Sequence, residues 1–244
     1  MIERVLPLHA VGADTSQEGV DTVPVFPEEL ALVSGASAKR RAEFLAGRRC
    51  ARRVLRRLGH PDTPITPGAD GVPRWPDGIT GSITHCAGYR AAAAAPRTAL
   101  AALGIDAEPD APMERVMWNR VFHPSEHAFL HSGEQGVFPT REGGRQPVSW
   151  DRLIFSAKEA VYKAWFPLTG TRLGFHDVRI TPTPMTGGAG RFAVRLSTVA
   201  AARLRPGTAV PVFDGRWARA DGLLVTVVAA HHHGAARTVP ARRT

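Results

Sequence analysis

Two acidic side chains, Asp106 and Glu108, stand two residues apart in the segment GIDAEP, residues 104–109. If this segment is a β-strand, both carboxylates point to the same face of the sheet, because side chains alternate with a period of two. Carboxylates held side by side repel each other unless a cation neutralises them, and hard oxygen ligands suit Mg²⁺. The pair is a candidate metal site; the alternative is an exposed edge strand with ordinary polar residues.

A second set of reactive side chains lies in FSAKEAVYKAW, residues 155–165. The chain has 31 Lys and Arg, yet its only lysines are Lys39, Lys158 and Lys163. On a helix, Glu159 and Lys163 share one face because they are four residues apart. An ordinary surface pair would explain them, but their apolar neighbours indicate a partly buried helix, where an ionic pair needs a reason.

A third candidate is the pair Thr84 and His85 in GSITHC, residues 81–86, which follows a loop rich in Pro and Gly (60–80). A single histidine is commonly structural. A Thr-His pair close to a basic helix is also suited to bind phosphate, so both interpretations stay open.

The basic helix is predicted over residues 37–59, where a partial apolar stripe precedes Gly59 and Pro61. Its other face carries a run of arginines, which are Arg40, Arg41, Arg48, Arg49, Arg52, Arg53, Arg56 and Arg57. This face is either simply solvated or binds an anion.

The composition is that of a globular protein of 244 residues, with 43% hydrophobic residues and a formal net charge of +9. Such a charge favours an anionic partner, although a genome that prefers Arg codons explains part of it. No apolar run is long enough for a signal peptide or a membrane span, so we expect a cytoplasmic protein without a membrane partner. The two cysteines, Cys50 and Cys86, are expected to be free thiols.

These candidates must be positioned by a mixed α+β fold. We expect an irregular segment over residues 1–35, and a second long helix over 149–166 with Ser149 as its N-cap and Pro167 at its end. A short helix is expected over 124–131. Strands are expected over residues 81–86, 90–95, 98–109, 176–182, 190–197, 209–219 and 222–231, the first three forming an antiparallel meander.

The pattern predicts two similar α+β lobes, each with one long helix packed on a small antiparallel sheet. The expected boundaries are residues 1–108 for the first lobe and 109–232 for the second. Residues 233–244 are expected to form a disordered tail, and the run His231–His233 to belong to this solvated end rather than to a metal site.

The motifs together resemble a known family. GIDAE, followed about fifty residues later by FSAKEAVYK, resembles the signature of 4′-phosphopantetheinyl transferases, with Phe155 where the family usually has Trp. The blocks GSITHCAGYRAAA, GVPRWPDG and RRAEFLAGRRCARRVLRRLG are similar to the Sfp and enterobactin-synthase type. The resemblance covers most of residues 37–175. It implies a pseudo-dimer of two lobes that acts as a monomer, since the chain is about twice as long as the small trimeric synthases of the superfamily.

The resemblance also implies an activity. The family transfers the phosphopantetheine arm of coenzyme A to a serine of an apo acyl or peptidyl carrier protein of polyketide and nonribosomal peptide synthesis, and releases adenosine 3′,5′-bisphosphate. By similarity, Asp106, Glu108 and Glu159 would hold Mg²⁺, or Mn²⁺ in its place. Glu159 would deprotonate the incoming serine, and Lys163 would contact the α-phosphate and support the leaving group.

Further positions match family residues that bind coenzyme A. Arg40 and Arg48 match those at the 3′-phosphate and nucleotide, Thr84 and His85 match a pair at the coenzyme A phosphates, and Lys158 is a candidate phosphate contact. One position departs from the pattern, because Asp70 stands where some relatives carry a lysine, which leaves Arg74 as a candidate replacement.

The segment 121–131 and the loop after it match the region where relatives contact the carrier. Two other functions compete with the transferase. A nucleic-acid-binding module built on the arginine-rich helix would leave the three carboxylates unexplained, and no helix-turn-helix or zinc pattern appears, so we expect no nucleic-acid partner. Another Mg²⁺-dependent phosphoryl enzyme acting on coenzyme A or a nucleotide would turn over without a carrier.

Overall fold

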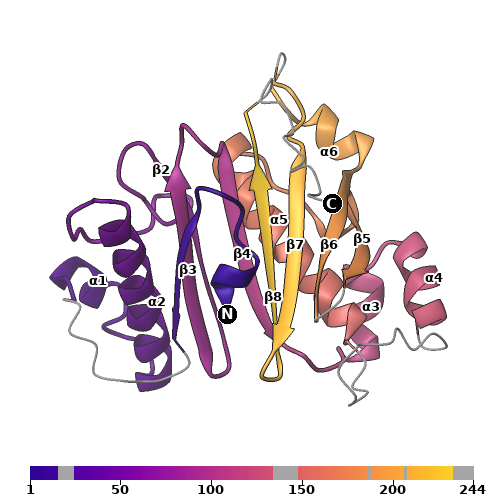
Figure 1. Ribbon diagram of the computed structural model, residues 1–244, viewed down its shortest axis with the longest axis horizontal. Helices are drawn as coiled ribbons and strands as arrows, with labels where there is room; N and C mark the ends of the chain where they lie inside the picture. The colour runs from indigo at the N-terminus through magenta and orange to yellow at the C-terminus, as the bar shows by residue number, and fades with distance from the viewer. Residues whose placement is uncertain (16–24, 134–147, 186–187, 206–207, 233–244) are drawn as a thin grey trace, which may run out of the picture.

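The computed structural model describes residues 1–15, 25–133, 148–185, 188–205 and 208–232 (Figure 1). Its helices are η1 (Ile2–Arg4), α1 (Pro27–Ala31), α2 (Ala38–Arg57), α3 (Arg115–Val121), α4 (Pro124–Gly133), α5 (Trp150–Thr169), η2 (Phe175–Asp177) and α6 (Thr198–Ala202), where η marks a 3₁₀ helix. Its strands are β1 (Val11–Thr15), β2 (Ile79–Cys86), β3 (Tyr89–Pro96), β4 (Ala102–Pro109), β5 (Val178–Met185), β6 (Ala189–Leu196), β7 (Phe213–Ala220) and β8 (Leu223–Ala230).

The strands form two antiparallel sheets, which confirms the predicted α+β class. The first sheet has the order β1-β3-β2, and the second has the order β4-β8-β7-β6-β5. Helix α2 packs on the first sheet and α5 on the second, so each sheet carries one long helix as expected (Figure 1).

Helix α2 begins and ends as its sequence predicts. The hydroxyl of Ser37 caps it by accepting a hydrogen bond from the backbone N–H of Arg40 (3.3 Å). Gly59 follows its last turn with φ of 80°, a left-handed conformation that glycine adopts without strain. Its buried face, which includes Cys50 and Val54, packs on strand β3.

Strand β3 shows why a run of alanines forms a strand here despite its helix propensity. Ala92 and Ala94 pack in the same core as Val54 and Leu55 of α2. Ala91, Ala93 and Ala95 point the other way, into a core that they share with β4. Small side chains let both layers approach the strand, so tertiary packing outweighs local propensity.

Helix α5 begins where the sequence predicts but ends later than expected. Ser149 occupies the N-cap position, but its side chain makes no capping hydrogen bond. At the other end the helix continues through Pro167 to Thr169, and Gly170 closes it with φ of 66°. Pro167 lies in the last turn, and its missing N–H removes one helical hydrogen bond, that to the carbonyl of Lys163.

Strand β4 corrects the expected meander. It pairs with β8, so that Asp106 lies opposite Thr226, and it belongs to the second sheet. Beside β2 it makes side-chain bonds instead of a ladder: Ile105 N–H donates to Ser82 Oγ and Ala107 N–H to Thr84 Oγ1, each at 3.1 Å. The hydroxyls of β2 thus join the two sheets, and the boundary after residue 108 stays a prediction.

The expectation of an irregular segment over residues 1–35 is wrong. Strand β1 pairs with β3 from Val11↔Ala94 to Thr15↔Arg90. Helix α1 comes after β1 in the chain and directly before α2. These elements are too short to show periodicity, and β1 is defined by its partner strand. Helix α3 was likewise not predicted.

Several smaller expectations can be compared directly. Cys50 and Cys86 are free, as predicted. None of the helices in the described ranges is long and apolar enough to cross a bilayer. His231 and His232 are exposed at the end of β8, whereas the predicted tail and the loop after α4 lie outside the described residues.

Candidate active site

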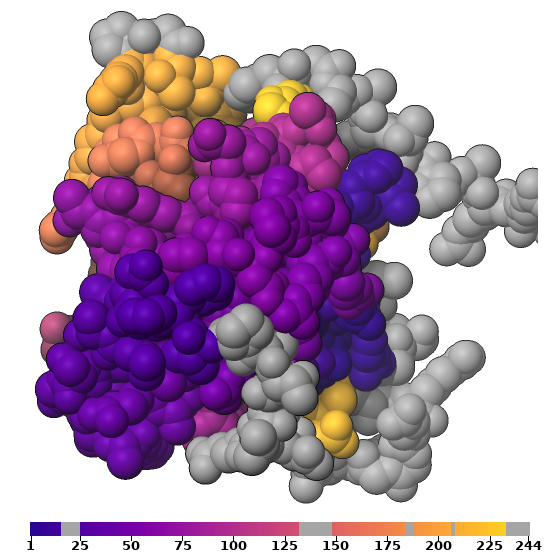
Figure 2. Space-filling view, turned by 90° about the vertical axis from the view of Figure 1, so that its left-hand side faces the viewer, coloured from indigo at the N-terminus to yellow at the C-terminus, as the bar shows by residue number. Residues whose placement is uncertain are grey.

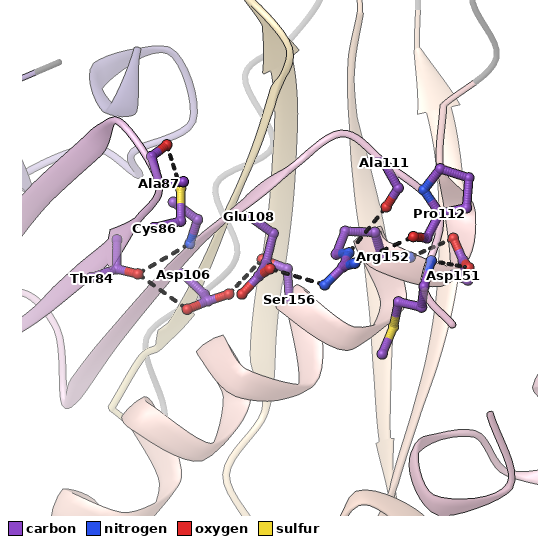
Figure 3. A network of polar contacts seen from close by, with 12 residues as sticks. Thr84, Cys86, Ala87, Asp106, Glu108, Ala111, Pro112, Asp151, Arg152 and Ser156 are labelled. Carbon is purple, nitrogen blue, oxygen red and sulfur yellow. Dashed lines mark hydrogen bonds and ion pairs between the residues drawn. The ribbon is translucent and has the colours of Figure 1, made fainter. Parts of the chain in front are cut away.

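A polar stripe along α5 faces the carboxylates of β4. The stripe consists of Arg152, Ser156, Glu159 and Lys163, which are spaced so that they share one side of a helix. Figure 3 shows Asp106 and Glu108 pointing from the strand toward this side of the helix. One strand and one helix therefore bring together the two acidic motifs of the sequence.

Gly104 makes this close approach possible. A Cβ atom at this position would lie 2.0 Å from the carbonyl oxygen of Ala160 and 2.8 Å from the backbone nitrogen of Ala164. Both atoms belong to the backbone of α5, which cannot move aside locally. The glycine of GIDAE thus places the strand directly on the helix turn that carries Glu159 and Lys163.

Asp106 is the central residue of the network. It is buried, and its Oδ1 accepts hydrogen bonds from Lys163 Nζ (2.7 Å) and Thr84 Oγ1 (3.1 Å). Its Oδ2 accepts a bond from Ser156 Oγ (2.8 Å), which also contacts Thr226 Oγ1 (2.9 Å). Both sheets and α5 therefore orient this carboxylate.

The charged forms of the other two carboxylates, Glu108 and Glu159, are disfavoured by their surroundings. Burial and the charge of Asp106 raise the pKa of Glu159, and the same two causes raise the pKa of Glu108. Arg152 offsets part of the cost, since its Nη1 donates to Glu108 Oε2 at 3.2 Å (Figure 3). The site is thus a place where added positive charge would be favourable.

This electrostatic character and the oxygen-only donor set fit a hard divalent cation. Within the described ranges, however, no group of three or more His, Cys, Asp or Glu side chains is already arranged to hold a metal ion. Donors from Lys163, Thr84 and Ser156 occupy both oxygens of Asp106. The chemistry of the donors fits, and the three-ligand set remains a prediction.

A cationic group lies on the first-lobe side of this network. Arg40 Nη1 is 2.9 Å from His85 Nε2, and both side chains are exposed. Partial burial and the charge of Arg40 lower the pKa of His85, with a smaller effect from Lys163. The ring is therefore neutral at pH 7, and an anion beside it would favour its protonation. Figure 2 looks onto this side, where α1, α2 and the following loop form most of the surface in indigo to purple.

Arg48 lies further along α2 and is almost fully buried. Its Nε donates to the carbonyl oxygen of Ile65 (2.7 Å), and its guanidinium stacks 4.2 Å from the Phe44 ring centroid. Burial lowers the pKa of Arg48 to about 10, so the group stays charged at neutral pH. Arg40 is therefore exposed near His85, whereas Arg48 is held inside the first lobe; binding of a nucleotide by either residue remains a prediction.

Two side chains predicted to contact coenzyme A, Thr84 and Lys158, have other partners within the protein. The hydroxyl of Thr84 donates to Asp106 and accepts from Ala107 N–H, so it is directed at the carboxylates rather than at a phosphate site. Lys158 is buried and directs its ammonium at Glu126 and at two backbone carbonyls. Adjacent residues of a helix point about 100° apart, so Lys158 lies on a different side of α5 from Glu159.

Sequence reasoning missed the residues that hold the carboxylates in place. Ser156 and Arg152 belong to the same helix face as Glu159, and this spacing was the signal that could have identified them. Thr226 gave no local signal, because it reaches Ser156 only through the pairing of β4 with β8.

Cys86 lies close to Asp106 and Glu108 (Figure 3). Burial and these two negative charges raise the pKa of its thiol to about 11. The thiol is therefore protonated at neutral pH, which is unfavourable for a nucleophile.

Comparison with known proteins covers both halves of the chain. The family model of the 4′-phosphopantetheinyl transferase N-terminal domain matches residues 28–95, and that of the 4′-phosphopantetheinyl transferase superfamily matches residues 102–205. The 4′-phosphopantetheinyl transferase Svp of Streptomyces mobaraensis is 44% identical over 238 residues, which are 94% of this chain and 89% of that protein.

Two further relatives show the breadth of the similarity. The 4′-phosphopantetheinyl transferase PptT of Mycobacterium tuberculosis is 42% identical over 207 residues, with 83% of this chain and 84% of that protein covered. Enterobactin synthase component D of Salmonella typhimurium is 31% identical over 229 residues, with 91% and 86% covered.

Proposed function

The chain belongs to the 4′-phosphopantetheinyl transferase superfamily, and we propose that it transfers the phosphopantetheine arm of coenzyme A to a serine of an apo acyl or peptidyl carrier protein. The observation that carries this proposal is the contact between β4 and α5. It brings Asp106 into a hydrogen bond with Lys163 and close enough to Glu108 and Glu159 to raise their pKa values, while Arg40 and His85 lie on the neighbouring lobe. Anion-binding groups thus stand on one side of the carboxylates.

Asp106, Glu108 and Glu159 are the residues that would hold the Mg²⁺ or Mn²⁺ ion. When bound, the ion would neutralise negative charge on the pyrophosphate and polarise its bonds. The raised pKa values of Glu108 and Glu159 support this assignment, because a cation removes the repulsion that raises them.

Glu159 is also the candidate to accept the proton of the carrier serine. A base is more effective when its pKa lies nearer to neutral pH, and burial shifts Glu159 in that direction. The serine belongs to the partner, so the chain itself needs no nucleophile.

Lys163 is the candidate to stabilise the leaving phosphate. Its ammonium is partly exposed and already lies 2.7 Å from Asp106, at the edge of the carboxylates. A compact ammonium can serve both the carboxylate and a phosphate oxygen as a point charge. Arg40, Arg48 and His85 would bind the nucleotide part, where forked guanidinium donors suit phosphate oxygens.

The carrier would approach from the side of α3 and α4, which lie between β4 and α5 in the chain. Val116 and Met117 of α3 are exposed, and Arg120 adds a positive charge to the same helix. This surface suits an acidic, partly apolar partner. Action as a monomer in the cytoplasm belongs to the same proposal.

A mass measurement tests this function. The protein is incubated with coenzyme A, Mg²⁺ and apo carrier proteins of fatty-acid, polyketide and peptide synthesis, and each carrier is weighed. We expect the mass of one phosphopantetheine to be added, and loss of a base to lower kcat about 100-fold or more in Glu159→Gln.

Glu28→Gln changes an exposed glutamate of α1 and serves as the matched control, with activity equal to that of the wild type. Unchanged carrier masses throughout would refute the proposal. Turnover of coenzyme A without any carrier would favour a different phosphoryl enzyme, and tight nucleic-acid binding at physiological salt would favour the nucleic-acid module.

A further inference from the structure

A buried ion pair lies directly behind the turn of α5 that carries Glu159. Lys158 Nζ donates to Glu126 Oε2 at 2.6 Å, and the two side chains are only 1% and 3% exposed. The remaining ammonium donors reach the carbonyl oxygens of Val121 (2.8 Å) and Phe175 (2.9 Å). All three N–H groups of the ammonium are therefore used within the protein.

Glu126 is bound just as completely on its own side. Its Oε2 also accepts from the backbone N–H of His123 (2.8 Å), and its Oε1 accepts from the backbone N–H of Ile180 (2.7 Å). The bond to His123, together with the bond from Glu126 N–H to the His123 carbonyl, forms the start of α4. One carboxylate thus links the beginning of α4 to strand β5.

The two residues together join five elements around one point. Lys158 belongs to α5, Val121 ends α3, Phe175 begins η2, Glu126 lies in the first turn of α4, and Ile180 lies in β5. Two buried charges are costly unless they are paired and hydrogen-bonded, and removal of one partner leaves the other uncompensated. The geometry of this point is therefore strongly constrained.

We propose that Lys158 is a positioning residue that acts through Glu126 and fixes α3 and α4 against the α5 turn that carries Glu159. The inference rests on the proposed function, because α3 and α4 are where the carrier would bind. Lys158 and Glu159 are adjacent, so the same helix turn presents a carboxylate to the substrate on one side and anchors the docking segment on the other. Lys158 then sets the position of the carrier serine and makes no contact with coenzyme A.

A double-mutant cycle separates this role from a phosphate contact. We would compare Lys158→Met, Glu126→Gln and the double variant, with Arg191→Met as a control that breaks the exposed pair with Asp214. Lys158→Met is expected to raise KM for the carrier about tenfold or more because it leaves Glu126 buried and unpaired, and KM for coenzyme A should stay within about twofold. The double variant should recover most of the loss, since it removes both charges.

Hydrogen exchange of the amides in 121–127, measured without substrates, provides a second readout. Lys158→Met should lose protection there, the double variant should regain it, and Arg191→Met should match the wild type. This measurement also keeps the two proposals apart, because it remains informative if the wild-type protein transfers nothing.

Three results would overturn the proposal. A rise in KM for coenzyme A in both Lys158→Met and the double variant would assign Lys158 to a phosphate. Unchanged exchange in Lys158→Met would show that the ion pair does not hold α3 and α4. Lost protection with an unchanged KM for the carrier would leave Lys158 with a structural role alone.

Discussion

Helices α2 and α5 are each 20 residues long and each packs on one sheet, yet their charges are used differently. On α2, several arginines are balanced by carboxylates of the same lobe. Arg52 forms a fully buried pair with Glu29, and the more exposed Arg56 and Arg57 pair with Asp62 and Glu3. On α5, the carboxylate of Glu159 lies beside that of Asp106, and repulsion between them raises its pKa.

The strand under each helix explains the difference. Helix α2 lies on the alanines of β3, which contribute volume and no charge, and the charged residue at the start of that strand, Arg90, has the opposite sign to its partner Glu43 on α2 (3.8 Å). Helix α5 lies on β4, whose Asp106 and Glu108 point at it. A large number of charged residues on a helix therefore does not by itself indicate a ligand-binding site. A site arises where packing forces like charges together and leaves room for a ligand to relieve them.

The largest expected effect tests the packing that produces this contrast. Gly104→Ala would place a methyl group 2.0 Å from the Ala160 carbonyl oxygen, which belongs to the helix backbone. We expect a loss of about 3 kcal/mol or more in the free energy of unfolding, because overpacking against backbone cannot relax locally. Urea unfolding monitored by circular dichroism measures it.

The matched change on the other helix is Gly47→Ala. There the new Cβ would meet only Ile83 Cγ2 at 3.0 Å, a side-chain atom that can shift, and alanine favours the helix. We expect a change within about 1 kcal/mol of the wild type, in either direction. Equal losses in the two variants would show that the approach of α5 to β4 is not special.

A reciprocal exchange of cations gives an intermediate effect. Lys163→Arg puts a forked, bulkier group where the ammonium lies 2.7 Å from Asp106, so we expect kcat to fall about tenfold or more with little change in KM for coenzyme A. Arg40→Lys keeps the charge on α2 but loses the fork next to His85. It should raise KM for coenzyme A about threefold and leave kcat nearly unchanged.

Steady-state kinetics with saturating carrier separates the two constants. If Lys163→Arg lowered affinity for coenzyme A as much as it lowered kcat, Lys163 would have the binding role that we propose for Arg40. If Arg40→Lys lowered kcat, the proposed difference between α2, which would bind coenzyme A, and α5, which would act in the chemical step, would be wrong.

The smallest expected effect concerns stability and pH. Burial and the charge of Asp106 raise the folded-state pKa of Glu159. Between the unfolded-state pKa and this raised value the folded state holds more protons than the unfolded state, so stability falls as the pH rises through that range. Glu159→Gln removes that cost, and we expect its melting temperature at pH 7 to exceed that of the wild type by about 2 °C in metal-free buffer. The advantage should vanish below the ordinary glutamate pKa of about 4.3.

Replacement of Asp62 should change the melting temperature at pH 7 in the opposite direction to replacement of Glu159. Its hydrogen bond from Arg56 lowers the pKa of Asp62, so the pair contributes stability above the ordinary aspartate pKa and loses it as pH falls through the lowered value. Asp62→Asn should therefore melt below the wild type at pH 7 and converge with it in acid. Calorimetry from pH 3 to 8 measures both variants, and shifts of the same sign at pH 7 would contradict the comparison.

Much of the candidate site could be predicted because its signals are local. The period of two places Asp106 and Glu108 on one face of a strand, and the helical period does the same for Glu159 and Lys163. The long helices, the alanine strand and most strands of the second half were also predicted. The partners of Lys158 and Thr84 within the protein could not be predicted, because the sequence shows that a polar group is present but not toward which neighbour it turns.

The sequence by itself determined the chemistry of this protein: the number and spacing of its carboxylates, the few retained lysines, and a glycine at the position of β4 where α5 comes close. These are properties of single elements, whose periodicities are set by backbone geometry. Only the tertiary structure decided the partners. It moved β4 into the sheet of β8, turned Lys158 toward Glu126, and directed Thr84 at Asp106. Such choices depend on contacts between residues far apart in the chain, such as Asp106 and Thr226. No local pattern encodes the competition among burial, pairing and hydrogen bonding that settles them.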